Sequence, residues 1–319
     1  MANESRVLLF FIDGLGIGTR GPHNPFVGLN DAAPLAVFQK DFVGAGLVPA
    51  RSLENTRRAG TSPAPTVPFD GMVVPTDACL GVAGRPQSAS GQTTILTGVN
   101  APQTIGAHKQ GFPNPPLLDI IREHSIFRQL KNRGIESITF ANTYTTRFFE
   151  RRPRWISATT AAVEAAGMRF NVVDDLRAGR AVYHDFTNAT LAERGEQAAL
   201  RTPEEAGQVL AKIVSLHRFT LYEYFITDKI GHAQDYDEAR RVLPMLARFI
   251  RTTLAQLDLT NTTMLLTSDH GNIEDLSVRN HTLNPVPTII WGRSQQLIAS
   301  RVRSLVDITP AIVEALTVN

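Results

Sequence analysis

Short apolar segments recur along the chain, and several of them end at an acidic residue or a turn. The first segment, residues 7–12, contains six consecutive apolar residues and is closed by Asp13-Gly14. A continuous apolar run of this length is typical of a strand that is buried on both faces. Comparable runs, which we also interpret as strands, occupy residues 138–141, 224–227, 264–267 and 288–291.

Between these runs, apolar residues recur at the spacing of an amphipathic helix. The segments with this pattern are residues 117–132, 158–167, 203–217, 236–257 and 307–317. Strands that alternate with helices favour an α/β fold with a mostly parallel sheet. We therefore expect a single catalytic domain over residues 1–319.

Two segments depart from this alternation. Residues 51–75 are rich in Arg, Pro, Ser and Thr, which indicates a long surface loop or flap. Residues 145–200 hold a cluster of arginines followed by a polar stretch, and we expect a small insertion or lid there. The clustered arginines are Arg147, Arg151, Arg152 and Arg154.

Composition narrows the class of protein. The chain is 43% hydrophobic and 19% charged, as in ordinary globular proteins, and its net charge is +2. No dense basic run is present to follow a nucleic-acid backbone, so we expect no nucleic-acid partner. The single cysteine, Cys79, excludes an intrachain disulfide, and the first apolar run is too short to span a membrane. We therefore predict a cytoplasmic protein with no membrane partner.

Acidic residues and histidines gather where predicted strands end. In open α/β sheets, ligands bind at the carboxyl ends of the strands, so side chains from distant segments can share one crevice. Imidazole nitrogens and carboxylate oxygens suit Zn²⁺ and Mn²⁺, and six of them exceed the needs of one tetrahedral site. The pattern thus predicts two metal ions. The six residues are Asp13, Asp228, His232, Asp269, His270 and His281.

A candidate nucleophile, Ser88, lies in the small-residue segment 84–98. A turn there leads into a predicted helix near residues 90–97. A helix N-terminus attracts phosphate through its free backbone N–H groups and partial positive charge. A serine at this position can become an activated nucleophile, and Ser90 is a rival candidate on composition alone.

Taken in order, these motifs resemble the alkaline phosphatase superfamily, and most closely its branch of cofactor-independent phosphoglycerate mutase and phosphopentomutase. The resemblance extends from residue 8 to residue 292. Its motifs are Phe11-Ile-Asp13-Gly-Leu-Gly16, Ser88 with Thr97-Gly98, Asp228-Lys-Ile-Gly-His232, Ser268-Asp269-His270-Gly271 and His281-Thr-Leu-Asn-Pro-Val-Pro287.

The resemblance implies a three-layer α/β/α sandwich and a role for each matching residue. Asp228, His232 and His281 would hold one divalent ion. A second ion would be held by Asp13, Asp269, His270 and the Ser88 oxygen. The ions would be Zn²⁺ or Mn²⁺, with Mg²⁺ also possible. Ser88 would attack phosphorus and form a phosphoserine intermediate.

The short stretch between Ser88 and Asp228 leaves little room for the sizeable second domain that the mutases carry there. A mutase must keep its intermediate away from water, so we expect a phosphomonoester hydrolase that acts on a small phosphorylated metabolite. The alternatives are a small phosphomutase and a phosphodiesterase on the same metals. A binding module without activity would require a lost ligand position, and none is lost. Candidates for substrate contacts are His108, Lys109, Arg147 and Lys229.

Overall fold

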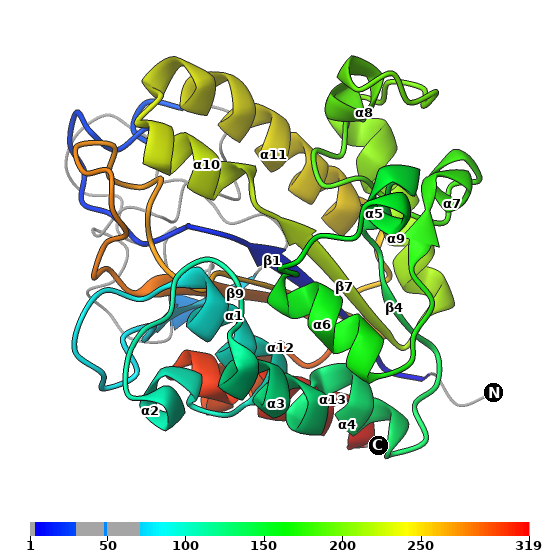
Figure 1. The fold of residues 1–319 in the computed structure, drawn as a ribbon, viewed down its shortest axis with the longest axis horizontal. Coiled ribbons are helices and arrows are strands. Elements are labelled where there is room, and N and C mark those ends of the chain that lie inside the picture. The colour runs from blue at the N-terminus through cyan, green and yellow to red at the C-terminus, as the bar shows by residue number, and fades with distance from the viewer. Residues whose placement is uncertain (1–3, 30–47, 50–70, 319) are drawn as a thin grey trace.

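A central sheet organises the molecule, and four of its strands run in parallel side by side. The computed structural model describes residues 4–29, 48–49 and 71–318. In this part of the chain the sheet has seven strands in the order β2-β3-β9-β8-β1-β7-β4 (Figure 1). Strands β8, β1, β7 and β4 are parallel, whereas β9 is antiparallel to both β8 and β3. The bounds are β1 (Arg6–Ile12), β2 (Val48–Pro49), β3 (Met72–Thr76), β4 (Ile138–Phe140), β7 (Phe219–Tyr224), β8 (Thr262–Thr267) and β9 (Val286–Gly292).

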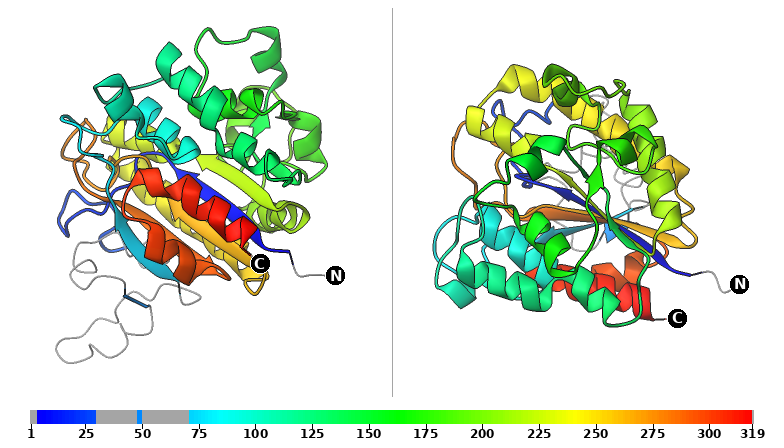
Figure 2. Two further views of the ribbon diagram at one scale, coloured as in Figure 1. Left: turned by 90° about the horizontal axis from the view of Figure 1, so that it is seen from below. Right: turned by 45° about the vertical axis from the view of Figure 1, so that its right-hand side comes forward.

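Helices cover both faces of this sheet, which explains why β1 is apolar from Val7 to Ile12. Val7, Leu9 and Phe11 belong to one hydrophobic core and Leu8 and Phe10 to the other, because successive side chains of a strand point to opposite faces. The first core includes α1 (Ser88–Thr97), α3 (Pro115–His124), α4 (Ile126–Lys131), α6 (Ala158–Ala165), α12 (Gln295–Arg301) and α13 (Ile308–Thr317). The second core includes α9 (Pro203–Leu216), α10 (Ile226–Ala233) and α11 (Tyr236–Gln256). The expected three-layer sandwich with a mostly parallel sheet is confirmed, and Figure 2 shows the layers from two further sides.

The strand predicted at residues 224–227 is displaced. Strand β7 covers Phe219–Tyr224, and helix α10 begins at Ile226. Thr220 and Glu223 interrupt the apolar pattern of β7, although both are buried. Asp228 and His232 therefore lie on a helix, one turn apart, instead of following directly after a strand.

The helix predicted over residues 117–132 is divided in two. Ser125 adopts an extended conformation between α3 and α4, with φ −57° and ψ 142°. The other four predicted helices correspond to α6, α9, α11 and α13.

The loop predicted at residues 51–75 lies mostly outside the described residues. For the last part of this segment the prediction of a loop is wrong, because Met72–Thr76 form β3, which pairs with β9. The segment 145–200 is partly built into the main fold through α6, and its lid role stays a prediction. Its other elements, together with β5 (Thr143–Tyr144) before it, are α5 (Thr146–Glu150), β6 (Asn171–Val172), α7 (Val173–Arg177) and α8 (Ala189–Glu193). Within the described ranges, no helix is both long and apolar enough to cross a bilayer.

Candidate active site

A first cluster of candidate metal ligands lies between the ends of β1 and β8. Asp13 directly follows β1. One loop residue separates the end of β8 from Asp269, and His270 comes next. Since β1 and β8 are parallel neighbours, their carboxyl ends meet at one edge of the sheet. His270 Nε2 lies 3.2 Å from Asp13 Oδ1 and 3.5 Å from Asp269 Oδ2. All three side chains are buried.

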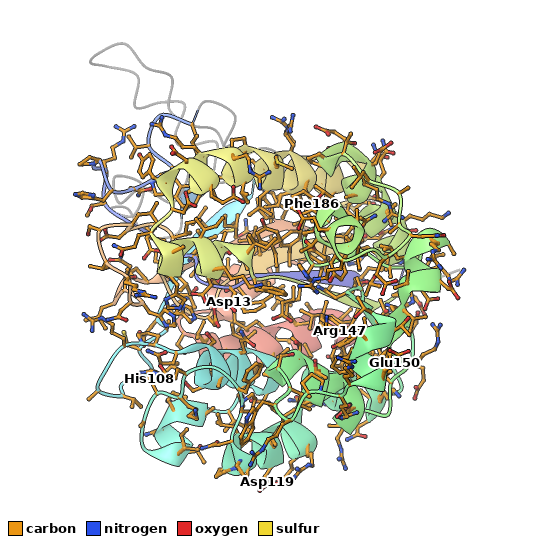
Figure 3. The ribbon with its side chains drawn as sticks, turned by 45° about the horizontal axis from the view of Figure 1, so that its top comes forward. Asp13, His108, Asp119, Arg147, Glu150 and Phe186 are labelled. Carbon is orange, nitrogen blue, oxygen red and sulfur yellow. The ribbon has the colours of Figure 1, made fainter. Side chains whose placement is uncertain are left out.

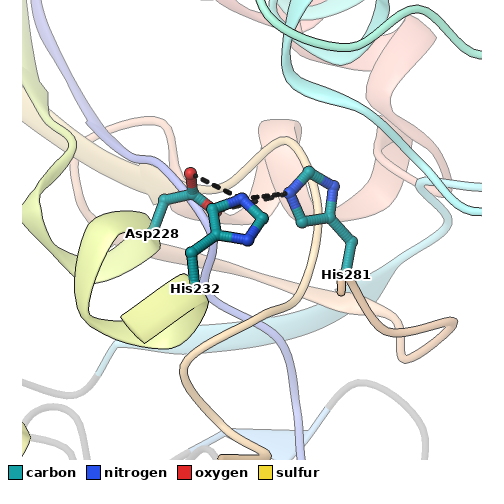
Figure 4. Close-up of side chains that lie close together, drawn as sticks. All are labelled: Asp228, His232 and His281. Atoms are coloured by element: carbon teal, nitrogen blue, oxygen red, sulfur yellow. Dashed lines mark hydrogen bonds and ion pairs between the residues drawn. The ribbon is translucent and has the colours of Figure 1, made fainter. Parts of the chain in front are cut away.

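A second cluster joins helix α10 to the loop before β9. Asp228 and His232 come from α10, and His281 reaches them from that loop (Figure 4). His232 Nε2 and His281 Nε2 lie 3.2 Å apart, and each is 3.4 Å from a carboxylate oxygen of Asp228. One donor atom from each residue can be chosen so that all lie within 4.8 Å of one another, as in the first cluster.

The two clusters are adjacent and touch through one histidine of each. The rings of His270 and His281 are stacked, with centroids 3.6 Å apart and an interplanar angle of 11°. The structure thus places all six candidate ligands in one continuous region, although they come from both ends of the chain.

Ser88 faces the first cluster. It is the first residue of α1, so the helix begins two residues earlier than the sequence pattern indicates. Its hydroxyl oxygen lies 2.9 Å from His270 Nε2. Helix α1 comes this close because residue 91 is glycine: a Cβ there would lie 2.9 Å from both the Cβ and the backbone oxygen of Asp269.

The rival candidate Ser90 is turned away from the ligand clusters. Its side chain is fully buried, and its hydroxyl donates to the Gln87 carbonyl at 3.2 Å. The same hydroxyl accepts a hydrogen bond from the backbone N–H of Lys109 at 3.0 Å. Ser90 thus ties α1 to the following loop, and its oxygen is not directed into the site.

The buried acids of the first cluster fit a cation. Burial raises the pKa of Asp13, and it raises that of Asp269 well above the ordinary value. Asp269 Oδ2 is buried and has no hydrogen-bond partner among the described residues. Buried carboxylates are normally paired or bound to metal, so the donor set and this unpaired oxygen suit a divalent ion.

The pKa of Asp228, in the second cluster, is shifted in the opposite direction. Burial acts to raise its pKa, but the hydrogen bond with His281 and the charge of His270 outweigh this and lower the pKa to about 2. Asn272 Nδ2 donates to Asp228 Oδ1 at 2.7 Å and adds to this effect. The carboxylate is therefore ionised at neutral pH and available as a ligand.

Contacts with backbone carbonyls outside the cluster orient His281 and His232. His281 Nδ1 lies 2.8 Å from the Pro86 carbonyl, and His232 Nδ1 lies 2.9 Å from the Arg279 carbonyl. In both rings the other nitrogen, Nε2, is left to face the cluster. Fixing one ring nitrogen on a backbone carbonyl in this way is how proteins orient metal-binding histidines.

Sequence reasoning missed several polar residues that organise the site. Glu274 is buried, and its carboxylate accepts hydrogen bonds from the backbone N–H groups of Gly16 and Asn272 and from the side chains of Thr282 and Asn284. No local sequence pattern marks this role, because three of the four partners lie in segments that approach Glu274 only in the folded chain.

Two further polar side chains near Asp13 escaped the sequence pattern. Gln92 Nε2 donates to Asp13 Oδ2 at 3.0 Å. Glu223 is buried on β7 and accepts a hydrogen bond from the Thr159 hydroxyl. Burial, followed by the charge of Asp13, raises the pKa of Glu223 to about 7, although the hydrogen bond from Thr159 acts against this.

Two cavities open beside Ser88 and Asp228. One, of about 580 Å³, is lined by His232, His281 and Lys109. The other, of about 500 Å³, is lined by Asp13 and Lys229. The remaining candidates for substrate contacts, His108 and Arg147, line neither cavity; in Figure 3 they lie on opposite sides of Asp13.

Comparison with known proteins finds a family match for the C-terminal part of the chain. Residues 180–319 match the model of the Metalloenzyme superfamily. The 2,3-bisphosphoglycerate-independent phosphoglycerate mutase of Ehrlichia canis (strain Jake) is 30% identical over 122 residues, which are 35% of this chain and 24% of that mutase. The chain thus matches about a quarter of the length of this curated relative.

Similarity to a solved structure at this low identity supports the fold alone. The lipoteichoic acid synthase LtaP from Listeria monocytogenes superposes with a TM-score of 0.50 at 9% identity, over 99% of this chain and 72% of that chain. The alkaline phosphatase from the Antarctic bacterium TAB5 gives a TM-score of 0.49 at 12% identity, over 99% of both chains.

The C-terminal part of the chain is similar to the Metalloenzyme superfamily, and about a third of the chain is similar to phosphoglycerate mutases of the cofactor-independent type. These similarities support the family predicted from the motifs. The superfamily consists of metal-dependent phosphoryl-transfer enzymes.

Proposed function

We propose that this protein transfers the phosphoryl group of a small phosphomonoester to Ser88, with the help of two divalent metal ions. The observation that carries the proposal is the position of Ser88, whose hydroxyl lies 2.9 Å from His270 Nε2 and which lines both cavities. A nucleophile at a helix N-terminus, beside two ligand clusters, is the arrangement that phosphoryl transfer requires.

The residues present suit two ions. Asp13, Asp269 and His270 would hold one, and the second cluster would hold the other. Bound there, the ions would supply positive charge to the nucleophile and to the phosphoryl oxygens. Zn²⁺ and Mn²⁺ fit a set of carboxylates and imidazoles, and Mg²⁺ fits the carboxylates.

The chain's own residues then have defined tasks. Helix α1 directs its free N-terminal N–H groups toward an incoming phosphate. The Ser88 oxygen forms a bond to phosphorus, the ester P–O bond breaks, and the proton lost by Ser88 is balanced by the proton that the departing alkoxide gains. In the second half, an acceptor oxygen takes the phosphoryl group and Ser88 recovers its proton.

The acceptor decides between two functions. Transfer to another hydroxyl of the same molecule would make the protein a phosphomutase, which the similarity to phosphoglycerate mutases supports. Transfer to water would make it a phosphatase, and the His232 side chain, 43% exposed, supports access of water to the second cluster. A phosphodiesterase remains a third candidate, and a diester substrate tests it.

Ser88→Ala tests the proposal. After reconstitution with Mn²⁺, Zn²⁺ or Mg²⁺, we expect the parent to release phosphate from p-nitrophenyl phosphate or to isomerise a sugar phosphate or phosphoglycerate. The Ser88→Ala variant should lose at least about 1,000-fold in kcat, the order that removal of a covalent nucleophile costs. Ser300→Ala, at an exposed position of α12, is the matched control. Equal rates for parent and Ser88→Ala would reject Ser88 as the nucleophile.

The fate of the phosphoryl group separates the functions. Phosphorus NMR of the product mixture distinguishes an isomerised substrate from inorganic phosphate. Bis(p-nitrophenyl) phosphate serves as the diester.

A further inference from the structure

The outer part of the larger cavity is lined by side chains that the catalytic proposal does not use. Beyond Ser88 and the second ligand cluster, its wall carries two aromatic rings, those of Phe112 and Trp155. The same wall carries three side-chain amides, which belong to Gln87, Gln110 and Asn280. This part of the cavity therefore offers flat apolar faces together with neutral hydrogen-bonding groups.

Both rings are largely exposed. Phe112 is 49% and Trp155 is 52% exposed, and neither packs against another aromatic ring of the described residues. A single exposed apolar side chain is common on protein surfaces. Two aromatic rings beside one cavity that also contains the nucleophile are different, because ligand sites are typically lined in this way.

The loop that carries Phe112 is fixed on both sides, although the ring itself is exposed. Before it, the backbone N–H of Ser90 donates to the Lys109 carbonyl at 3.2 Å, and the Ser90 hydroxyl accepts from the Lys109 N–H at 3.0 Å. After it, the Asn114 side chain caps α3 by accepting from the backbone N–H of Leu117 at 3.3 Å. A ring presented from such an anchored loop loses little freedom when a ligand packs on it.

Trp155 is held by a cation on one face. The guanidinium carbon of Arg154 lies 5.1 Å from the centre of the indole ring, and Arg154 forms no ion pair with a carboxylate of the described residues. Two residues later, Ser157 caps α6 by accepting from the backbone N–H of Thr160 at 3.1 Å. The cation orients the indole and leaves its opposite face for a ligand.

The polar groups of this wall are mostly neutral. The side chains of Gln87, Gln110 and Asn280 form no hydrogen bond with the rest of the described chain. Among the described lining residues, the one carboxylate is that of Asp228, a candidate metal ligand, and the one lysine or arginine is Lys109. The Lys109 ammonium already donates to the Gln110 carbonyl at 3.0 Å. The outer wall therefore suits an uncharged planar group with polar edges.

We propose that Phe112 and Trp155 bind the alcohol part of the substrate by stacking on a heteroaromatic ring, whose polar edge the three amides recognise. This inference rests on the proposed phosphoryl transfer, and it defines the substrate as a phosphomonoester of a nucleoside. A nucleobase combines flat faces with donors and acceptors along its edge, and proteins bind such bases by aromatic stacking and hydrogen bonds. A sugar alone offers no π face to the two rings.

Matched substrates test this assignment. The probes are the 5′-monophosphates of adenosine, guanosine, cytidine and uridine, with methyl riboside 5-phosphate as the reference that keeps the sugar and the phosphate but lacks the base. The variants are Phe112→Ala, Trp155→Ala and their combination. Phe149→Ala is the control, because this ring is also exposed, at 46%, but lines neither cavity.

We expect the parent to prefer the best nucleotide to methyl riboside 5-phosphate by at least about tenfold in kcat/KM, as base stacking on aromatic side chains provides. The combined variant should lose this preference, and Phe149→Ala should keep it. A parent without preference, or a combined variant that retains it, would overturn the proposal. Equal losses for nucleotide and riboside would also overturn it, because they would place the rings on the sugar or the phosphate.

A binding measurement separates this inference from the proposed function. The chain has two tryptophans, and because Trp291 is fully buried, a base that stacks on the exposed Trp155 should quench the emission of Trp155 alone. Titration of metal-free Ser88→Ala protein with adenosine follows this stacking without metal or turnover. We expect saturable quenching by adenosine and none by methyl riboside, and Phe112→Ala in this background should weaken binding at least about fivefold.

The two measurements fail independently. Saturable quenching by adenosine in a protein whose parent transfers no phosphoryl group would support the base subsite and refute the phosphoryl-transfer proposal alone. Turnover that depends on Ser88 but not on the base, with no quenching by any of the four nucleosides, would refute the subsite and leave the Ser88 chemistry intact.

Discussion

Removing Glu274 should disturb every loop that carries candidate ligands. The carboxylate holds the backbone N–H of Gly16, which follows Asp13, and that of Asn272, which follows His270. It also holds the hydroxyl of Thr282, which directly follows His281. One buried side chain thus fixes three segments that are far apart in the sequence.

The expected loss follows from the partners left behind. In Glu274→Ala, the two backbone N–H groups cannot turn toward new partners, and each unpaired buried donor costs about 1–3 kcal/mol. The Thr282 hydroxyl and the Asn284 amide can reorient and cost less. We expect the free energy of unfolding to fall by about 3–5 kcal/mol. Glu274→Gln keeps the shape and one acceptor oxygen, so its loss should be about 1–2 kcal/mol.

Urea unfolding of the chelator-treated protein measures this loss, and competition with a chelator measures metal affinity. Residues that support ligands from outside typically contribute 10–100-fold to metal affinity, so Glu274→Ala should weaken binding by about that factor. Glu314→Gln, which changes a partly exposed carboxylate paired with Arg301, is the control and should leave metal affinity unchanged. The reasoning is refuted if Glu274→Ala unfolds within about 1 kcal/mol of the parent and binds metal equally well.

Two further predictions concern packing and pH. Gly91→Ala would press a methyl group against Asp269, so we expect the variant to lose about 1–3 kcal/mol in stability and to bind metal more weakly. The control Gly21→Ala has open space around the added methyl group and should be neutral. Equal melting temperatures for the two variants would contradict this prediction. Glu223, with a pKa raised from 4.5 to about 7, binds more protons in the folded than in the unfolded protein, so the stability of the metal-free protein should fall as pH rises from 4.5 to 7. Glu223→Gln should remove about 3 kcal/mol of that fall in urea unfolding curves, and an unchanged pH profile would exclude Glu223 as its source.

The sequence predicts the strands that are apolar throughout and fails where a buried strand carries polar residues. Strand β1 was found because both of its faces are hydrophobic. Strand β7 was displaced because Glu223 and Thr220 break its pattern. The burial of Glu223 depends on the Thr159 hydroxyl, 64 residues away, and no local pattern reveals such a partner.

The candidate ligands could be assembled from the sequence because each belongs to a short motif, and the motifs appear in the order of a known family. Their support could not be assembled in this way. Glu274 acquires its role only when three loops meet around it. The choice between Ser88 and Ser90 likewise depended on which hydroxyl the helix directs outward.

The central position of β1 sets an order of events during synthesis. This strand leaves the ribosome before its partners, because it pairs on one side with β7 and on the other with β8, both more than 200 residues later. Its apolar surface stays without these partners until they have been made, and such long-range pairing is slow and prone to aggregation. We therefore expect the nascent chain to depend on chaperones, and fragments that begin after β1 to lack the strand that joins the two halves of the sheet.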